Sequence, residues 1–252
     1  MTSLFQIAPS LEQQAIRLFC VPHAGVGPSA FRGWKEQLGP EIETTVVQLP
    51  GREGRFREKP YERLEVLAND LTEAVLPYLA DGQRFAFFGN SLGGLISFET
   101  LHEIQRRTGR HAMHFFVSAT AAAHIPPPLP PVGDLSDGEL VREVSARYGG
   151  IPTLVLQDEE FLAAVLSTLR ADLRMLEAYK RRTPHPLSCP ITAFGGSRDW
   201  TVPVEHVDGW SEQTIASFTR VLLDEEHLYL QSAREKLIFH VRETLLAAAC
   251  PL

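Results

Sequence analysis

The chain has 252 residues, of which 44% are hydrophobic and 22% charged, the balance of a soluble globular protein with one large domain. Its formal net charge of -7 disfavours a nucleic-acid partner, because neutralising phosphates requires a basic face. No apolar run approaches the roughly 20 residues that cross a bilayer, so we expect no membrane segment. Residues 1–9 do not resemble a secretory signal, and the three cysteines lack disulfide or zinc spacing, so we expect a cytoplasmic protein without a metal site.

Apolar runs and helical periodicities alternate along the first half of the chain. The pattern predicts strands at 15–21, 44–49, 85–88 and 113–118, and helices at 29–38, 64–78 and 92–107. Such an alternation favours a mostly parallel central sheet with right-handed crossovers and helices on both faces. The expected fold class is therefore α/β.

An insertion interrupts this rhythm at about residues 124–187. It opens with five prolines between 126 and 131, which favour a stiff extended connector. One amphipathic helix is predicted within it, capped by Asp158 and carrying an apolar stripe from Leu162 to Leu176. We interpret the insertion as a helical lid. Strands at 191–194 and 218–223 follow, with helices at 204–212 and 231–248.

The sequence Gly-Asn-Ser-Leu-Gly at 89–93 lies between a predicted strand and a predicted helix. This context is that of a nucleophile elbow, in which a strained turn projects a serine hydroxyl and the flanking glycines let the strand and helix approach. The motif is similar to that of the α/β-hydrolases and indicates Ser91 as a nucleophile.

A serine hydroxyl needs a base within hydrogen-bond reach, and in this fold the chain order is serine, acid, histidine. Asp199 follows the strand at 191–194, and His227 follows the strand at 218–223. These two residues are the predicted acid and base. Asp208 is the reserve acid, and His206 is expected on a solvated helix face.

Backbone donors are needed for the oxyanion that forms during acyl transfer. The residue after the nucleophile, Leu92, supplies the first N–H. The second is expected on the loop after an early strand, and we assign it to Ala24 in the Pro-His-Ala-Gly segment at 22–25. Ser91, Asp199, His227, Ala24 and Leu92 form the predicted catalytic set.

At this point the chain resembles the type II thioesterases, the stand-alone editing enzymes of polyketide and nonribosomal peptide assembly lines. The resemblance rests on the segments 22–25, 48–53 with Arg55 and Phe56, 89–93, 116–119 and 169–172. It implies the α/β-hydrolase fold, the triad Ser91, Asp199 and His227, and an acyl chain carried on the phosphopantetheine arm of an acyl or peptidyl carrier protein. No metal or organic cofactor is implied, and we expect a monomer.

The chain departs from the family pattern in two places. Asn90 stands where a histidine is usual, and Glu225 and Glu226 replace a Gly-Gly pair before the catalytic histidine. We hypothesise that the two carboxylates favour the imidazolium form of His227.

A group of cations on or just after the lid helix could meet an acidic carrier protein, although a solvated helix end explains them equally well: Arg170, Arg174, Lys180, Arg181 and Arg182. Two other functions stay open. A general carboxylesterase or lipase shares the catalytic apparatus, and a catalytically silent module that holds a carrier protein would retain the fold.

Overall fold

The computed structural model describes residues 4–7, 10, 16–79, 82–149, 151, 153–180 and 185–249. Within them lies a six-stranded sheet in which every neighbouring pair of strands is parallel. The strands are β1 (Ile16–Val21), β2 (Ile42–Val46), β3 (Phe85–Asn90), β4 (His114–Ser118), β5 (Ile191–Gly196) and β6 (Phe218–Leu223), in the order β2-β1-β3-β4-β5-β6. The predicted parallel sheet is confirmed. The predicted strand residue 15 lies outside the described residues.

The strand order reverses beside β1. The chain passes from β1 outward to β2 and then returns to β3 on the other side of β1. In such sheets the loops after the two central strands diverge and leave a crevice at the carboxyl ends of the strands. Ser91 follows β3 and Ala24 follows β1, so both predicted site residues lie at this crevice.

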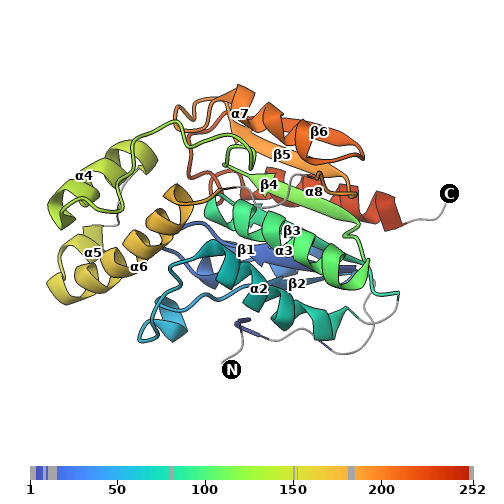
Figure 1. The fold of residues 1–252 in the computed structure, drawn as a ribbon, viewed down its shortest axis with the longest axis horizontal. Coiled ribbons are helices and arrows are strands. Elements are labelled where there is room, and N and C mark those ends of the chain that lie inside the picture. Colours follow the sequence, from blue (N-terminus) through green and yellow to red (C-terminus); the bar gives the residue numbers. More distant parts are fainter. Residues whose placement is uncertain are drawn as a thin grey trace.

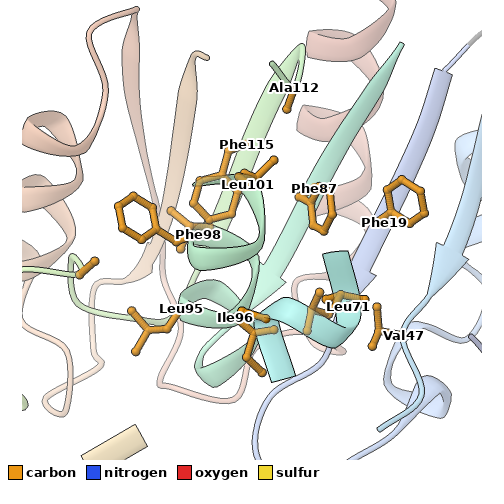
Figure 2. Packing of buried hydrophobic residues seen from close by; sticks show 14 of the residues in the cluster. Phe19, Val47, Leu71, Phe87, Leu95, Ile96, Phe98, Leu101, Ala112 and Phe115 are labelled. Carbon is orange, nitrogen blue, oxygen red and sulfur yellow. The ribbon is translucent and has the colours of Figure 1, made fainter. Parts of the chain in front are cut away.

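Helices cover both faces of the sheet (Figure 1). On one face α2 (Leu64–Val75), α3 (Leu92–Thr108) and α7 (Val204–Asp208) pack, and on the other α1 (Trp34–Leu38) and α8 (Arg234–Ala249). The strands alternate their side chains between the two layers: Phe87 is buried on the α2–α3 side and Phe88 on the α1–α8 side. Figure 2 shows Phe19, Phe87 and Phe115, from the neighbouring strands β1, β3 and β4, beside residues of α2 and α3.

Several predicted boundaries are wrong for identifiable reasons. The predicted strand 44–49 is instead Ile42–Val46, and the charged residue Glu43 stands in it because its carboxylate lies 2.9 Å from the buried Arg17 Nε. The predicted helix 29–38 breaks into the 3₁₀ turn Pro28–Phe31 and α1, because Gly33 between them adopts a φ of 83°.

The other helices differ mainly at their ends. The predicted helix 204–212 is α helical only to Asp208 and continues as the 3₁₀ turn Gly209–Gln213, since glycine weakens the helix at this point. The predicted helix 64–78 is α helical to Val75 and ends in the 3₁₀ turn Leu76–Tyr78, which contains Pro77. The last helix begins at Arg234 rather than at residue 231.

The insertion holds three described helices rather than one: α4 (Asp137–Tyr148), α5 (Thr153–Leu156) and α6 (Glu159–Glu177). In Figure 1 they gather beyond one end of the sheet. The predicted cap is confirmed, because the Asp158 carboxylate accepts a hydrogen bond of 2.9 Å from the Phe161 N–H. Leu166, Leu169 and Leu173 of the predicted stripe pack with Leu140 and Val144 of α4 in a separate apolar cluster. No helix in the described ranges combines the length and apolarity that crossing a bilayer requires.

Candidate active site

Ser91 occupies a strained turn between β3 and α3. Its φ of 50° and ψ of -118° are rare for a residue with a side chain. The turn is held by a hydrogen bond of 2.7 Å from the Ser91 N–H to the Ser118 carbonyl. The flanking glycines are required sterically, because a Cβ at Gly89 would lie 2.4 Å from the Gly93 carbonyl oxygen, and one at Gly93 2.2 Å from that of Val21. The predicted elbow geometry is therefore present.

The structure brings the three predicted triad residues together. The Ser91 hydroxyl lies 3.4 Å from His227 Nε2, and His227 Nδ1 lies 2.7 Å from Asp199 Oδ2. The serine hydroxyl can donate to Nε2 only if the imidazole proton is on Nδ1, where Asp199 accepts it. The reserve acid Asp208 is instead on α7, where it forms an ion pair with Arg220 of β6.

Asp199 is held in its ionised form by its surroundings. Its second oxygen accepts hydrogen bonds from the hydroxyl and the N–H of Thr201, at 2.6 and 2.9 Å. Burial alone would raise the pKa of the Asp199 carboxyl, but the hydrogen bonds from His227 and Thr201 outweigh burial and leave this pKa below its ordinary value. Asp199 can therefore orient and charge-stabilise His227 at neutral pH.

Tyr229 anchors the loop that carries His227. Its hydroxyl donates to the Phe194 carbonyl and accepts from the Ala119 N–H and the Ser118 hydroxyl, each at 2.9 Å. The loop also lies tightly against the end of β5, where a Cβ on Gly196 would come within 2.5 Å of the Glu225 carbonyl oxygen. The histidine is thus fixed to the ends of β4 and β5.

The two predicted oxyanion donors lie at the ends of β1 and β3. Within the described chain neither the Ala24 N–H nor the Leu92 N–H donates a hydrogen bond. Ala24 follows His23, whose Nδ1 lies 3.0 Å from the Ala24 carbonyl oxygen. Burial, with a smaller contribution from the nearby His227, lowers the pKa of His23 to about 4, so this ring is neutral at pH 7.

Two cavities meet at Ser91 and His227. The larger, about 720 Å³, runs under α6 and has a mainly apolar wall that includes Ile151, Val165 and Leu169. The smaller, about 450 Å³, runs along the proline-rich segment after β4 and includes Arg147 and Lys180. Tyr148, Leu173 and Leu176 of the insertion border both cavities.

The predicted docking cations differ in their surroundings. Arg170 donates to the carbonyl oxygens of Gly133 and Leu135 and to Asp137, and Arg174 forms an ion pair of 2.8 Å with Asp134. These two arginines join α6 to the segment that leads into α4. Lys180 is exposed, and Arg181 and Arg182 lie outside the described residues.

The two departures from the family pattern have different environments. Asn90 is 1% exposed, and neither atom of its amide has a hydrogen-bond partner within the described residues. The Glu225 carboxylate accepts a hydrogen bond of 2.9 Å from the Ser232 hydroxyl, and Glu226 is exposed. The hypothesis that both glutamates favour the imidazolium form of His227 stays a prediction.

Sequence reasoning missed three features of the site. Thr201 binds Asp199, Tyr148 packs against His227, and Asp172 of α6 forms a buried ion pair with Arg52. The helix that carries Tyr148 had a readable signal, since Ser136 and Glu139 form a capping box in which the Ser136 N–H donates to the glutamate. Arg52 and Asp172 belong to segments on which the family resemblance rests, but the sequence alone assigned neither residue a role.

Comparison with known proteins shows that the chain is similar to thioesterases. The thioesterase-domain family model matches residues 16–245. The gramicidin S biosynthesis protein GrsT of Aneurinibacillus migulanus is 35% identical over 236 residues, covering 94% of this chain and 91% of GrsT. RedJ, a thioesterase of the prodiginine pathway of Streptomyces coelicolor, superposes with a TM-score of 0.83 at 36% identity over 95% of this chain and 96% of RedJ.

The name of a third relative states that it is a type II thioesterase. BorB, the type II thioesterase of the borrelidin biosynthetic cluster, superposes with a TM-score of 0.83 at 32% identity, covering 94% of this chain and 96% of BorB. The expected α/β-hydrolase fold and the resemblance to type II thioesterases are thereby confirmed. The chain belongs to the thioesterase family.

Proposed function

We propose that this thioesterase uses Ser91, Asp199 and His227 to hydrolyse acyl thioesters carried on the phosphopantetheine arm of acyl or peptidyl carrier protein domains. The observation that carries the proposal is the continuous series of contacts from Asp199 through His227 to Ser91, with the serine at the junction of two cavities. The names of GrsT, RedJ and BorB, which refer to gramicidin S, prodiginine and borrelidin biosynthesis, support the carrier-bound substrate.

The proposed reaction has two half-reactions. Ser91 Oγ attacks the thioester carbonyl while His227 Nε2 takes the hydroxyl proton, and the tetrahedral oxyanion accepts hydrogen bonds from the Ala24 and Leu92 N–H groups. The C–S bond then breaks, and the imidazolium of His227 gives its proton to the departing sulfur, which restores the neutral base. The thiol is a good leaving group, because a cysteine-like thiol has a pKa of only about 8.5. Water deprotonated by His227 then attacks the acyl-serine, the bond from the acyl carbon to Ser91 Oγ breaks, and His227 returns the proton to the serine oxygen as the free acid leaves. The chain's own groups suffice for each proton transfer, so we propose no metal or organic cofactor.

The two cavities suit the two halves of such a substrate. The larger one offers an apolar wall of α6 side chains, which favours an acyl chain. The smaller one includes Arg147 and Lys180, which suit the arm with its anionic phosphate. In this proposal the 124–187 insertion is a lid that covers both, and Lys180, Arg181 and Arg182 contact the carrier protein.

One comparison separates this function from its rivals. The enzyme is given an acyl carrier protein, the same acyl group on free pantetheine, and the matching oxygen ester. We expect the carrier-bound thioester to be hydrolysed fastest, whereas a general esterase would favour the oxygen ester. A fluorophosphonate should label Ser91 alone in the parent and nothing in Ser91→Ala, which a silent binding module would not do.

We also propose that the protein is a monomer and that it is located in the cytoplasm. All three triad residues come from one chain, which supports a self-sufficient protomer. Cys20 and Cys189 are free, buried thiols, as is usual in a reducing compartment. Light scattering on a size-exclusion column tests the first statement, and cell fractionation tests the second.

A further inference from the structure

One buried carboxylate joins the lid to the two loops beside the catalytic serine. Asp172 of α6 is 0% exposed, and its oxygens accept hydrogen bonds of 2.6 and 3.0 Å from the two terminal nitrogens of Arg52, on the loop after β2. The same carboxylate accepts a hydrogen bond of 2.8 Å from the N–H of Gly25, on the loop after β1. Arg52 is itself buried, and its Nε donates to the Pro50 carbonyl oxygen at 3.1 Å.

The bond to Gly25 acts on the oxyanion loop. The Gly25 N–H and the Ala24 carbonyl belong to one planar peptide group. Asp172 holds the nitrogen side of this group, and His23 Nδ1 lies 3.0 Å from its oxygen. Only the two backbone dihedrals of Ala24 then separate the fixed peptide from the preceding one, which carries the proposed oxyanion donor. Gly25 has a φ of 79°, and a Cβ there would lie 3.1 Å from Leu169 Cδ1, so α6 also confines the loop sterically.

The ion pair with Arg52 makes the contact between Asp172 and the Gly25 N–H specific. A fully buried carboxylate is tolerated only when it is paired and its lone pairs are satisfied, and a two-pronged arginine contact does both while fixing direction. Arg52 thereby orients the oxygen that receives the Gly25 N–H. Thr168, one turn earlier on α6, donates to the Gly51 carbonyl at 2.5 Å, so the helix meets the Arg52 loop at a second point.

We propose that Asp172, oriented by Arg52, is a positioning residue that sets the oxyanion hole, so that seating α6 on the core and forming the hole are one event. The inference rests on the proposed function, in which Ala24 is an oxyanion donor. In this inference Asp172, a lid residue that touches no reacting atom, affects the catalytic rate through the position of the Ala24 N–H.

The test compares Asp172→Asn with the parent in three measurements: kcat, KM and the inhibition constant of a trifluoromethyl ketone, whose adduct with Ser91 places an oxygen in the oxyanion hole. Losing a complete donor costs about 10²–10³ in kcat, so we expect a misplaced donor to lower kcat at least about tenfold. KM should change by less than about threefold, and the inhibition constant should rise in parallel with the fall in kcat.

A matched control breaks another ion pair, in which the arginine is buried and the glutamate is partly exposed. Glu43→Gln removes the carboxylate charge that pairs with Arg17 near the start of β1 and β2, the opposite end of the strands from the oxyanion loop. We expect it to lower the melting temperature while leaving kcat and the inhibition constant near the parent values. The inference is overturned if Asp172→Asn leaves the inhibition constant unchanged, or if Glu43→Gln lowers kcat as much at the same loss of melting temperature.

Two further variants keep the result interpretable. If Asp172→Asn does not fold, Arg52→Lys replaces it, since lysine retains the charge but loses the two-pronged contact. The same parallel between kcat and the inhibition constant is expected. Ser91→Ala, measured alongside, must abolish turnover. Residual activity equal to the parent's would reject the proposed function itself, whereas loss in Ser91→Ala with an unaffected Asp172→Asn would reject this inference alone.

Discussion

Tyr148, the last residue of α4, packs its ring against the imidazole of His227, with the two ring centroids 4.9 Å apart and the planes inclined at 48°. The contact joins the 124–187 insertion to the proposed general base, and Tyr148 borders both cavities. Aromatic pairs of this kind contribute about 0.5–1.5 kcal/mol beyond the area they bury.

We expect the ring of Tyr148, rather than its hydroxyl, to support catalysis. Tyr148→Ala should lower kcat/KM about tenfold for a short acyl thioester, because the imidazole loses the surface that holds it toward Ser91. Tyr148→Phe keeps that surface and should remain within about twofold of the parent. Steady-state kinetics on both variants check this. Equal activities of the alanine variant and the parent would show that the contact does not orient His227.

The larger cavity should set the acyl-chain preference. Ala164 of α6 lines it, and Ala164→Trp should lower kcat/KM for a long acyl chain at least about tenfold while leaving an acetyl thioester within about twofold. Ala163→Trp is the matched control, because Ala163 is exposed and outside the cavity wall. A series of acyl lengths on one pantetheine thiol gives the measurement. Equal losses for all lengths would place the acyl chain elsewhere.

The sequence predicted the elements that repeat a local pattern. β6 has the predicted bounds 218–223. The elbow at Ser91 could be predicted because it requires glycine at positions 89 and 93, where a side chain would clash with nearby backbone. Contacts between distant segments were not predictable in this way. Arg52 and Asp172 are 120 positions apart, and neither residue's local sequence indicates the other as its partner. Gly33 likewise breaks a predicted helix through its backbone conformation, which the spacing of apolar residues does not reveal.

The cations that follow α6 in the sequence, Lys180, Arg181 and Arg182, should affect carrier-bound substrate selectively. Reversing Lys180, Arg181 and Arg182 to glutamate should lower kcat/KM for an acyl carrier protein about tenfold at low salt, since charge steering raises association rates. A small free thioester should be cleaved at the parent rate. The control reverses Arg32, Lys35 and Lys236, which are exposed on the α1–α8 side and give the same change in net charge. Similar losses in both triple variants would argue for a general charge effect.

His114 should make the fold sensitive to acid. It lies on β4, with Nε2 2.8 Å from the Thr192 hydroxyl and its ring stacked on Phe116, and burial lowers its pKa from 6.5 to about 4. Between these values the unfolded chain binds a proton that the folded chain does not, so the free energy of unfolding decreases as pH falls from about 6.5 toward 4.

The expected loss from His114 at pH 4.5 is about 2 kcal/mol. His114→Gln should therefore show a decrease in the free energy of unfolding between pH 7 and pH 4.5 that is smaller by about that amount. Urea unfolding at the two pH values provides the measurement, and His111→Gln, at an exposed neighbouring position, is the control. The same pH dependence in parent and His114→Gln would contradict the role given to this ring.

The central claim is tested most directly by quenching the enzyme in acid within its first turnover on an acyl carrier protein and locating the acyl group by peptide mass spectrometry. We predict one acyl ester on Ser91 that disappears at the rate of acid release, and no adduct or turnover in Ser91→Ala. An acyl group on another residue, or an alanine variant that hydrolyses the substrate as fast as the parent, would contradict the account.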